Sequence, residues 1–207
     1  MTTNDLKLYH STSSSKSRRV RIFLAEKGLT VPLVPVDLGK GEQHSDAYRA
    51  INPRRVVPTL VLEDGTAIGE VLAIWRYLEE AYPTPPLLGS TPKDKALVTS
   101  GNGAPNSKVR NASERLKGRA IAGPYDYDQI PALVERSRLR VKNFYADLDA
   151  RLAALPFVAG DHFSAADITG LVTVDFATKA MSFPVPDEHK ALRRWFEKVS
   201  SRPSAAI

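Results

Sequence analysis

Apolar residues in the first third of the chain come in short runs separated by polar ones, a pattern that predicts strands alternating with helices. Residues 6–9 predict a first strand, and the serine-rich residues 11–17 predict a polar loop after it. The apolar cluster over 20–24 predicts a helix that reaches Lys27 and ends at Gly28, because glycine after lysine is typical of a helix C-terminus. The chain therefore begins with a strand, a loop and a helix.

The next segments predict a small sheet and a second helix. They are a strand over 33–36, a strand over 59–63, a short strand over 67–68 and a helix over 70–81. Pro35 has no N–H to give to a neighbouring strand, which favours the edge of the sheet for its strand. Asp64-Gly65 is typical of a hairpin turn between antiparallel strands. The first 82 residues thus predict βαβ followed by ββα.

Strand patterns nearly vanish after residues 82–86, whose prolines cannot continue a helix. The remaining pattern predicts an amphipathic helix over 130–155, an apolar helix over 165–180 and a third helix over 188–201. We therefore expect a small α/β domain over residues 1–82, a linker over 83–92 and an all-helical domain over 93–207.

One segment of the helical half opposes a helix. Residues 99–108 contain two glycines, one proline and two asparagines, all of them poor helix formers. We expect this segment to interrupt the first helix of the second domain. Ser164 and Asp167, by contrast, have the spacing of a capping box at the start of the apolar helix, and we assign them to folding. Trp195 and Phe196 are assigned to the hydrophobic core.

Composition excludes several kinds of chemistry. The 207 residues contain no cysteine, which excludes disulfides, cysteine-ligated zinc, a thiol nucleophile and a CxxC redox pair. Lys and Arg total 29 against 23 Asp and Glu, a formal net charge of +6, but the basic residues are scattered and lack interleaved aromatic side chains. We therefore expect no nucleic-acid partner, and a small anionic substrate suits the charge. Apolar runs fall far short of the ~20 residues of a membrane helix, so we expect a cytoplasmic protein with no membrane partner.

Three motifs in the chain belong together. The first is a hydroxyl-rich loop that enters a helix over 13–22, the second is the stretch over 52–60 followed by Ile68-Gly69-Glu70, and the third lies over 158–168. In this order and spacing they resemble the cytosolic glutathione transferases, over nearly the whole chain. The resemblance, closest to the serine-type zeta, theta and phi classes, implies a thioredoxin-like N-terminal domain, an all-α C-terminal domain, glutathione as co-substrate and no metal.

Val57-Pro58, directly before a predicted strand, is the first candidate glutathione contact. An ordinary trans proline that opens a strand is the commoner alternative, since only about 5–6% of X–Pro bonds are cis. The resemblance implies a cis bond here. Val57 would then offer its backbone N–H and C=O outward like an edge strand, to which an extended peptide such as glutathione pairs.

Further contacts are implied at two other places. Glu70 matches the acidic residue that meets the γ-glutamyl ammonium, and the alternative is a helix cap that complements the helix dipole. The family's next residue is usually serine, but Val71 stands here and keeps only the backbone N–H as a donor. Gln43 and His44 resemble the segment that reaches the glycyl carboxylate, and the alternative is an ordinary polar surface loop.

The serine-rich loop holds the candidate catalytic group. A thiol ionises with a pKa of about 8.5, and a hydroxyl that donates a hydrogen bond to sulfur favours the thiolate. Residues 14–20 resemble the zeta-class run of two serines, cysteine, serine, tryptophan, arginine and valine, which places Ser14 at the catalytic serine and Lys16 at the cysteine. The alternatives left open are Ser13, Ser15 and Tyr9, or a polar turn that only caps the helix.

The resemblance implies an enzyme, a glutathione S-transferase that conjugates the glutathione thiolate to a hydrophobic electrophile in detoxification and works as a homodimer. A zeta-like isomerase, in which glutathione adds and then leaves, is a second hypothesis. A third is a non-catalytic binding or regulatory protein of the same family. It rests on departures from the family pattern at Arg55, Val56 and Val71 and on the helix-poor segment 99–108.

Overall fold

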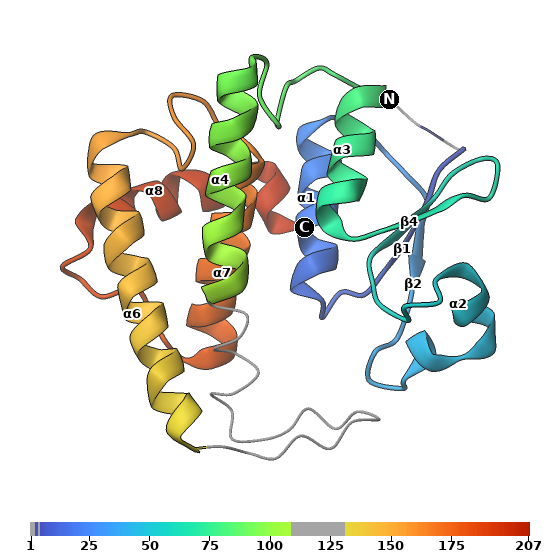
Figure 1. Ribbon diagram of the computed structural model, residues 1–207, viewed down its shortest axis with the longest axis horizontal. Coiled ribbons are helices and arrows are strands. Elements are labelled where there is room, and N and C mark those ends of the chain that lie inside the picture. The colour runs from blue at the N-terminus through green and yellow to red at the C-terminus, as the bar shows by residue number, and fades with distance from the viewer. Residues whose placement is uncertain (1–2, 4, 109–130) are drawn as a thin grey trace. The chain divides into compact units, whose positions relative to one another are not determined.

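The computed structural model describes residues 3, 5–108 and 131–207, and it divides into two compact units (Figure 1). Unit 1 comprises Met1–Leu87 together with Ala206–Ile207, and unit 2 comprises Leu88–Ala205. The division falls inside the predicted linker over 83–92. Within the described residues, no helix is long and apolar enough to cross a membrane.

Unit 1 is a four-stranded mixed sheet with helices on its faces. Its elements are β1 (Lys7–His10), α1 (Ser15–Glu26), β2 (Leu33–Pro35), the 3₁₀ helix η1 (Glu42–His44), α2 (Asp46–Ile51), β3 (Thr59–Val61), β4 (Ala67–Gly69) and α3 (Val71–Ala81). The strand order is β2-β1-β3-β4, with β1 parallel to β2 and antiparallel to β3. The predicted edge position of Pro35 and the hairpin at Asp64-Gly65 are both confirmed.

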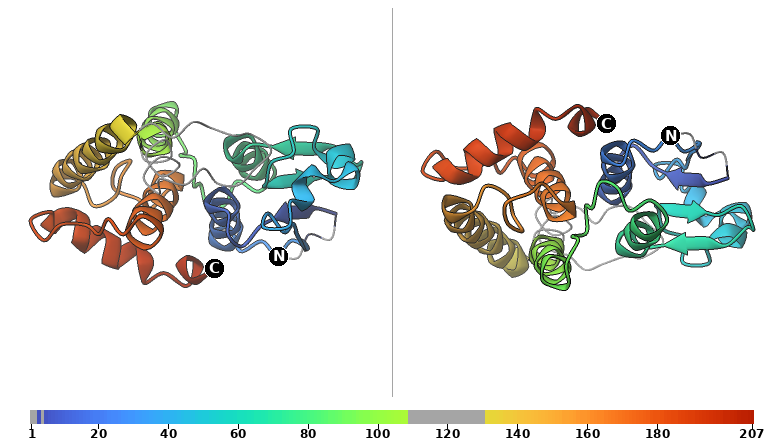
Figure 2. Two further views of the ribbon diagram at one scale, coloured as in Figure 1. Left: turned by 90° about the horizontal axis from the view of Figure 1, so that it is seen from below. Right: turned by 90° about the horizontal axis from the view of Figure 1, so that it is seen from above.

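Helices α1 and α3 pack side by side on one face of the sheet, and α2 lies beyond the other face (Figures 1 and 2). Phe23 of α1 stacks on Trp75 of α3 with ring centroids 5.2 Å apart, and both side chains are fully buried. Helix α2 and η1 were not predicted from the sequence. A helix of six residues is too short to show a helical period, and Ser45 caps it by accepting a hydrogen bond from the N–H of Tyr48.

Unit 2 is helical in its described residues. It contains α4 (Pro92–Lys108), α6 (Pro131–Ala154), α7 (Ala165–Met181), α8 (Lys190–Ser200) and the start of the 3₁₀ helix η2 (Pro203–Ala206). The three helices predicted after residue 130 are present, although residue 130 itself lies outside the described residues. Ser164 and Asp167 form the predicted capping box, and Trp195 lies in the core while Phe196 is half-buried.

The predicted interruption over 99–108 is wrong, because α4 continues to Lys108. Helix packing overrides local propensity here. Gly101 lies so close to α7 that a Cβ on it would come within 2.9 Å of the Cβ of Ala166. The buried Asn102 next to it accepts a hydrogen bond of 2.8 Å from the hydroxyl of Thr169. Gly101 and Asn102, which oppose an isolated helix, thus join α4 to α7.

Candidate functional site

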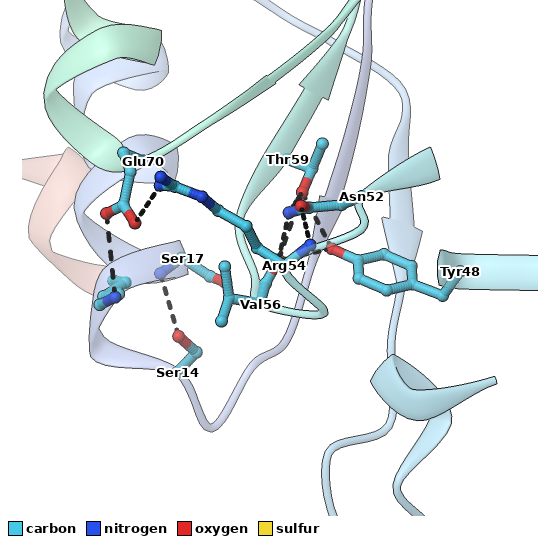
Figure 3. A network of polar contacts seen from close by, with 9 residues as sticks. Ser14, Ser17, Tyr48, Asn52, Arg54, Val56, Thr59 and Glu70 are labelled. Carbon is cyan, nitrogen blue, oxygen red and sulfur yellow. Dashed lines mark hydrogen bonds and ion pairs between the residues drawn. The ribbon is translucent and has the colours of Figure 1, made fainter. Parts of the chain in front are cut away.

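Ser14 lies at the N-cap of α1, between the serine-rich loop and the helix. Its Oγ accepts a hydrogen bond of 3.2 Å from the N–H of Ser17, and its backbone C=O accepts one of 3.0 Å from the N–H of Arg18 (Figure 3). Oγ accepts the bond from Ser17 with a lone pair, so the hydrogen of the hydroxyl can still be donated to another group. The half-buried hydroxyl also lies at the positive end of the α1 dipole. This position suits a donor to an anion.

The alternative hydroxyls have different surroundings. Ser13 is exposed and its Oγ lies 3.1 Å from Oγ of Ser11, while Ser15 is half-buried in the first turn of α1. Tyr9 is half-buried at the end of β1, where its ring meets the ring of Tyr48 edge-on with centroids 6.0 Å apart. Tyr9 therefore belongs to the small apolar cluster on that side of the sheet.

The bond between Val57 and Pro58 is cis, as expected. Val57 is buried and lies directly before β3, which begins at Thr59. Among the described residues, none hydrogen-bonds the N–H or the C=O of Val57. Backbone groups without an internal partner are the kind with which an added peptide strand pairs.

A buried polar network fixes the chain just before this cis bond. Asn52 Nδ2 donates to the C=O of Val56 at 2.9 Å and to Oγ1 of Thr59 at 2.8 Å. The hydroxyl of Tyr48 donates to the same C=O at 2.8 Å and lies 2.9 Å from the hydroxyl of Thr59. Figure 3 shows these side chains converging on Val56 from α2, from Asn52 directly after it, and from β3. Sequence reasoning missed this network, because its members come together only when the sheet has formed.

Glu70 is the N-cap residue of α3, but its side chain makes no capping hydrogen bond. The hydrogen-bonding part of the capping alternative is therefore wrong, whereas the carboxylate still lies at the N-terminal end of α3 where it complements the helix dipole. Its φ of 67° lies in the left-handed region, and its carboxylate faces two cations. Lys16 Nζ lies 4.0 Å from Oε2. Arg54 Nη1 lies 3.5 Å from Oε1 (Figure 3). Neither cation was assigned to this place from the sequence.

Val71 begins α3, and its side chain is buried in the core. Its N–H belongs to the first turn, where a helix has no acceptor of its own for the backbone donors. A carboxylate placed here would be favoured by the N–H and by the helix dipole. The position thus offers an anion a backbone donor but no hydroxyl.

Gln43 and His44 lie in η1. His44 is exposed, while Oε1 of Gln43 is buried and without a hydrogen-bond partner among the described residues. The structure shows no contact from either to Ser14, Val57 or Glu70 within the part of the chain it describes, so their role stays a prediction.

Arg55, where the family pattern usually has glycine, has a φ of 54°. A left-handed backbone at this place explains why glycine suits it.

His10 and Arg21 form a pair of basic side chains where β1 ends. His10 is buried at the end of β1, and Nη1 of Arg21 lies 3.2 Å from its Nδ1. Burial lowers the pKa of His10, and the positive charge of Arg21 lowers it further. The imidazole is therefore neutral at physiological pH. Within residues 3, 5–108 and 131–207, no group of three His, Asp or Glu side chains is arranged to hold a metal ion.

Comparisons with known proteins agree with this architecture. The family model for the glutathione S-transferase N-terminal domain matches residues 8–86, and the model for the C-terminal domain matches residues 131–198. Glutathione S-transferase 2 of Saccharomyces cerevisiae is 33% identical over 202 residues, which cover 95% of this chain and 86% of the relative.

Two further relatives add detail. Maleylacetoacetate isomerase of Rattus norvegicus is 46% identical over 93 residues, 44% of this chain and 43% of the relative. The crystal structure of a glutathione S-transferase domain-containing protein from Marinobacter aquaeolei VT8 superposes with a TM-score of 0.87 at 35% identity, covering 96% of this chain and 99% of that one. With family models matched in both of its domains and a relative 33% identical over 95% of its length, the chain is a member of the glutathione S-transferase family.

Proposed function

We propose that this chain conjugates the thiolate of glutathione to a hydrophobic electrophile, with Ser14 as the hydroxyl that stabilises the thiolate. The position of Ser14 carries the proposal, since its Oγ accepts from the helix while its hydrogen is free to donate. A carboxylate or thiolate at the start of α1 also gains from the helix dipole.

Glutathione binding follows from the surrounding groups. The cysteinyl backbone pairs with the N–H and C=O of Val57, in the manner of an added strand. The γ-glutamyl ammonium meets the Glu70 carboxylate, and the N–H of Val71 faces the γ-glutamyl carboxylate. Gln43 and His44 are the residues proposed to reach the glycyl carboxylate.

The reaction is a nucleophilic substitution or addition at the electrophile. The hydrogen bond from Ser14 favours the ionised thiol, which lowers its pKa below the ordinary value of about 8.5. The thiolate sulfur forms a thioether bond to the electrophilic carbon. A leaving group such as halide departs with its electron pair, or an acceptor double bond takes up a proton from water. The thiol proton goes to solvent when the thiolate forms.

A zeta-like isomerase is the second candidate, and the identity over 93 residues with maleylacetoacetate isomerase favours it. There the thiolate adds to a cis carbon–carbon double bond, the resulting single bond rotates, and the thiolate leaves again to give the trans product. The match covers 44% of this chain, and Lys16 replaces the cysteine of the zeta pattern. We therefore place conjugation first, and we expect a cytoplasmic homodimer with a role in detoxification.

Calorimetry with glutathione and a conjugation assay with an aryl halide test the proposal. Ser14→Ala and Ser14→Gly both remove the hydroxyl, but glycine retains most of the N-cap stability, whereas alanine costs about 1 kcal/mol. We expect both variants to lose conjugation by a similar factor and Ser14→Thr, which keeps hydroxyl and cap, to retain most of it.

Each other outcome has a definite meaning. If the wild-type chain binds no glutathione, the proposal fails. If the chain binds glutathione but neither conjugates an aryl halide nor isomerises a cis-enedioate, the result favours the non-catalytic alternative. Full activity in both Ser14 variants moves the role to Ser13, Ser15 or Tyr9.

A further inference from the structure

Three serines at the start of α1 are joined in a closed ring of hydrogen bonds. The N–H of Ser14 donates to the C=O of Ser11 at 3.3 Å, and the N–H of Ser17 donates to Oγ of Ser14 at 3.2 Å (Figure 3). The ring closes where the N–H of Ser11 donates to Oγ of Ser17, also at 3.2 Å. Since each bond joins one serine to the next, the position of Ser14 depends on both of the others.

Ser17 enters this ring twice, with its backbone N–H and with its hydroxyl oxygen. It lies in the first turn of α1 and is fully buried, with 0% exposure, whereas Ser14 is half-buried. Because no surface of Ser17 is exposed, its hydroxyl has no direct contact with a bound ligand. Any effect of Ser17 on the site must therefore pass through its neighbours in the ring.

The N–H of Ser11 depends on Ser17 for its acceptor. The pairing of β1 with β2 ends at His10, and its pairing with β3 ends at Tyr9. Ser11 is buried just beyond this point, where a backbone N–H without an acceptor is unfavourable. Oγ of Ser17 supplies the acceptor and so fixes the place where the chain leaves the sheet.

A second contact from α1 holds the same place. Arg21 lies one turn after Ser17, and its Nη1 lies 3.2 Å from Nδ1 of His10. Residues 14, 17 and 21 share one face of α1, because side chains three and four positions apart lie above one another on a helix. This face of α1 thus contacts two successive residues at the end of β1, and the turn that follows them leads to Ser14.

We propose that Ser17 is a positioning residue for the hydroxyl of Ser14. This inference rests on the proposed function, in which Ser14 stabilises the thiolate of glutathione. A donor that is already held in place stabilises a negative charge without first having to be ordered. Removing the Ser17 hydroxyl opens the ring at Ser11 and leaves Ser14 with its hydroxyl but without a fixed backbone before it.

Titration of the thiolate absorbance of bound glutathione tests this role in Ser17→Ala, Ser14→Gly and the double variant. Ser17→Ala keeps the N–H of residue 17 and removes only the acceptor of the Ser11 N–H. Thr169→Ala is the control, because Thr169 is also 0% exposed but donates its hydroxyl to Asn102, between α7 and α4. It reports the effect of losing a buried hydroxyl elsewhere in the chain.

We expect Ser17→Ala to raise the pKa of the bound thiol by at least about half a unit, which means about threefold less thiolate below that pKa. At such a pH, kcat with an aryl halide should fall by about the same factor, while KM for glutathione stays within about twofold of wild type. The double variant should have the thiol pKa of Ser14→Gly, because Ser17 acts only through the Ser14 hydroxyl. Thr169→Ala should have the wild-type pKa.

Two results overturn the inference while leaving the proposed function intact. One is a lowered thiol pKa in wild type that is unchanged in Ser17→Ala, and the other is a double variant whose thiol pKa lies above that of Ser14→Gly. If wild type binds no glutathione, or leaves its thiol pKa at the value of the free tripeptide, the proposed function fails and the inference fails with it. If Ser17→Ala does not fold, Ser17→Cys, which is similar in size and only a weak acceptor, replaces it with the same expectations.

Discussion

Replacing Gly101 by alanine is expected to destabilise the protein, although alanine is the better helix former. A Cβ at this position would lie 2.9 Å from the Cβ of Ala166 and 3.4 Å from Cγ1 of Val158, whereas carbon atoms pack best at about 3.5–4.0 Å. The Cβ of Ala166 is bonded directly to the backbone, so α7 itself must move. Overpacking of this kind costs about 1–3 kcal/mol, against a gain of about 1 kcal/mol in helix propensity. We therefore expect a net loss of about 1 kcal/mol in the free energy of unfolding.

Urea denaturation of a set of variants measures this loss. Ser100→Ala, at the exposed neighbouring position of α4, gains propensity without a clash and should be neutral or slightly stabilising. Ala166→Gly removes the opposing methyl group, so the double variant with Gly101→Ala should be more stable than the sum of the two single changes predicts, by about 1 kcal/mol. An unfolding free energy of Gly101→Ala above that of wild type would refute the close contact between α4 and α7.

Other parts of the structure give further predictions. Asp167→Ala leaves four donors without their acceptor, two of them the N–H of Val158 and the indole N–H of Trp195. Urea denaturation should show the unfolding free energy lowered by about 3–5 kcal/mol. A loss below about 1 kcal/mol would contradict the network. Asn52→Ala removes the donor to the C=O before Val57, and calorimetry should show glutathione affinity reduced at least about fivefold even where the variant remains folded. Because the pKa of His10 is lowered in the folded state, the unfolded chain binds more protons below about pH 6.5, and stability should fall as the pH drops through that value. His10→Gln should lose this part of the pH dependence, and an unchanged dependence would show that another group causes it.

The features predicted correctly from the sequence depend on a single residue or on residues within one turn of each other. Pro35 marked the edge strand because its missing N–H excludes it from a central position. Asp64-Gly65 marked the hairpin, where Gly65 has a φ of 83° that other residues rarely adopt. The capping box at Ser164 was predicted because both partners lie within four residues of each other.

The elements that escaped prediction depend on distant residues. The segment over 99–108 is helical because α7 lies against it, and composition alone contains no information on that partner. In the same way, Glu70 could be predicted as an acidic residue at the start of α3, but its two cations lie 54 and 16 positions earlier in sequence, at Lys16 and Arg54. The sequence therefore identified single residues of the site such as Glu70, whereas the folded sheet determines which charged side chains lie next to it.

The ionisation of glutathione bound to this chain directly reports the role proposed for Ser14. A titration of the thiolate absorbance against pH gives the pKa of the bound thiol. We predict a pKa at least about one unit below the ordinary thiol value of about 8.5 in the wild-type chain, and a return toward that value in Ser14→Gly. Bound glutathione that ionises at the same pH as the free tripeptide would contradict the role assigned to Ser14 and to the start of α1.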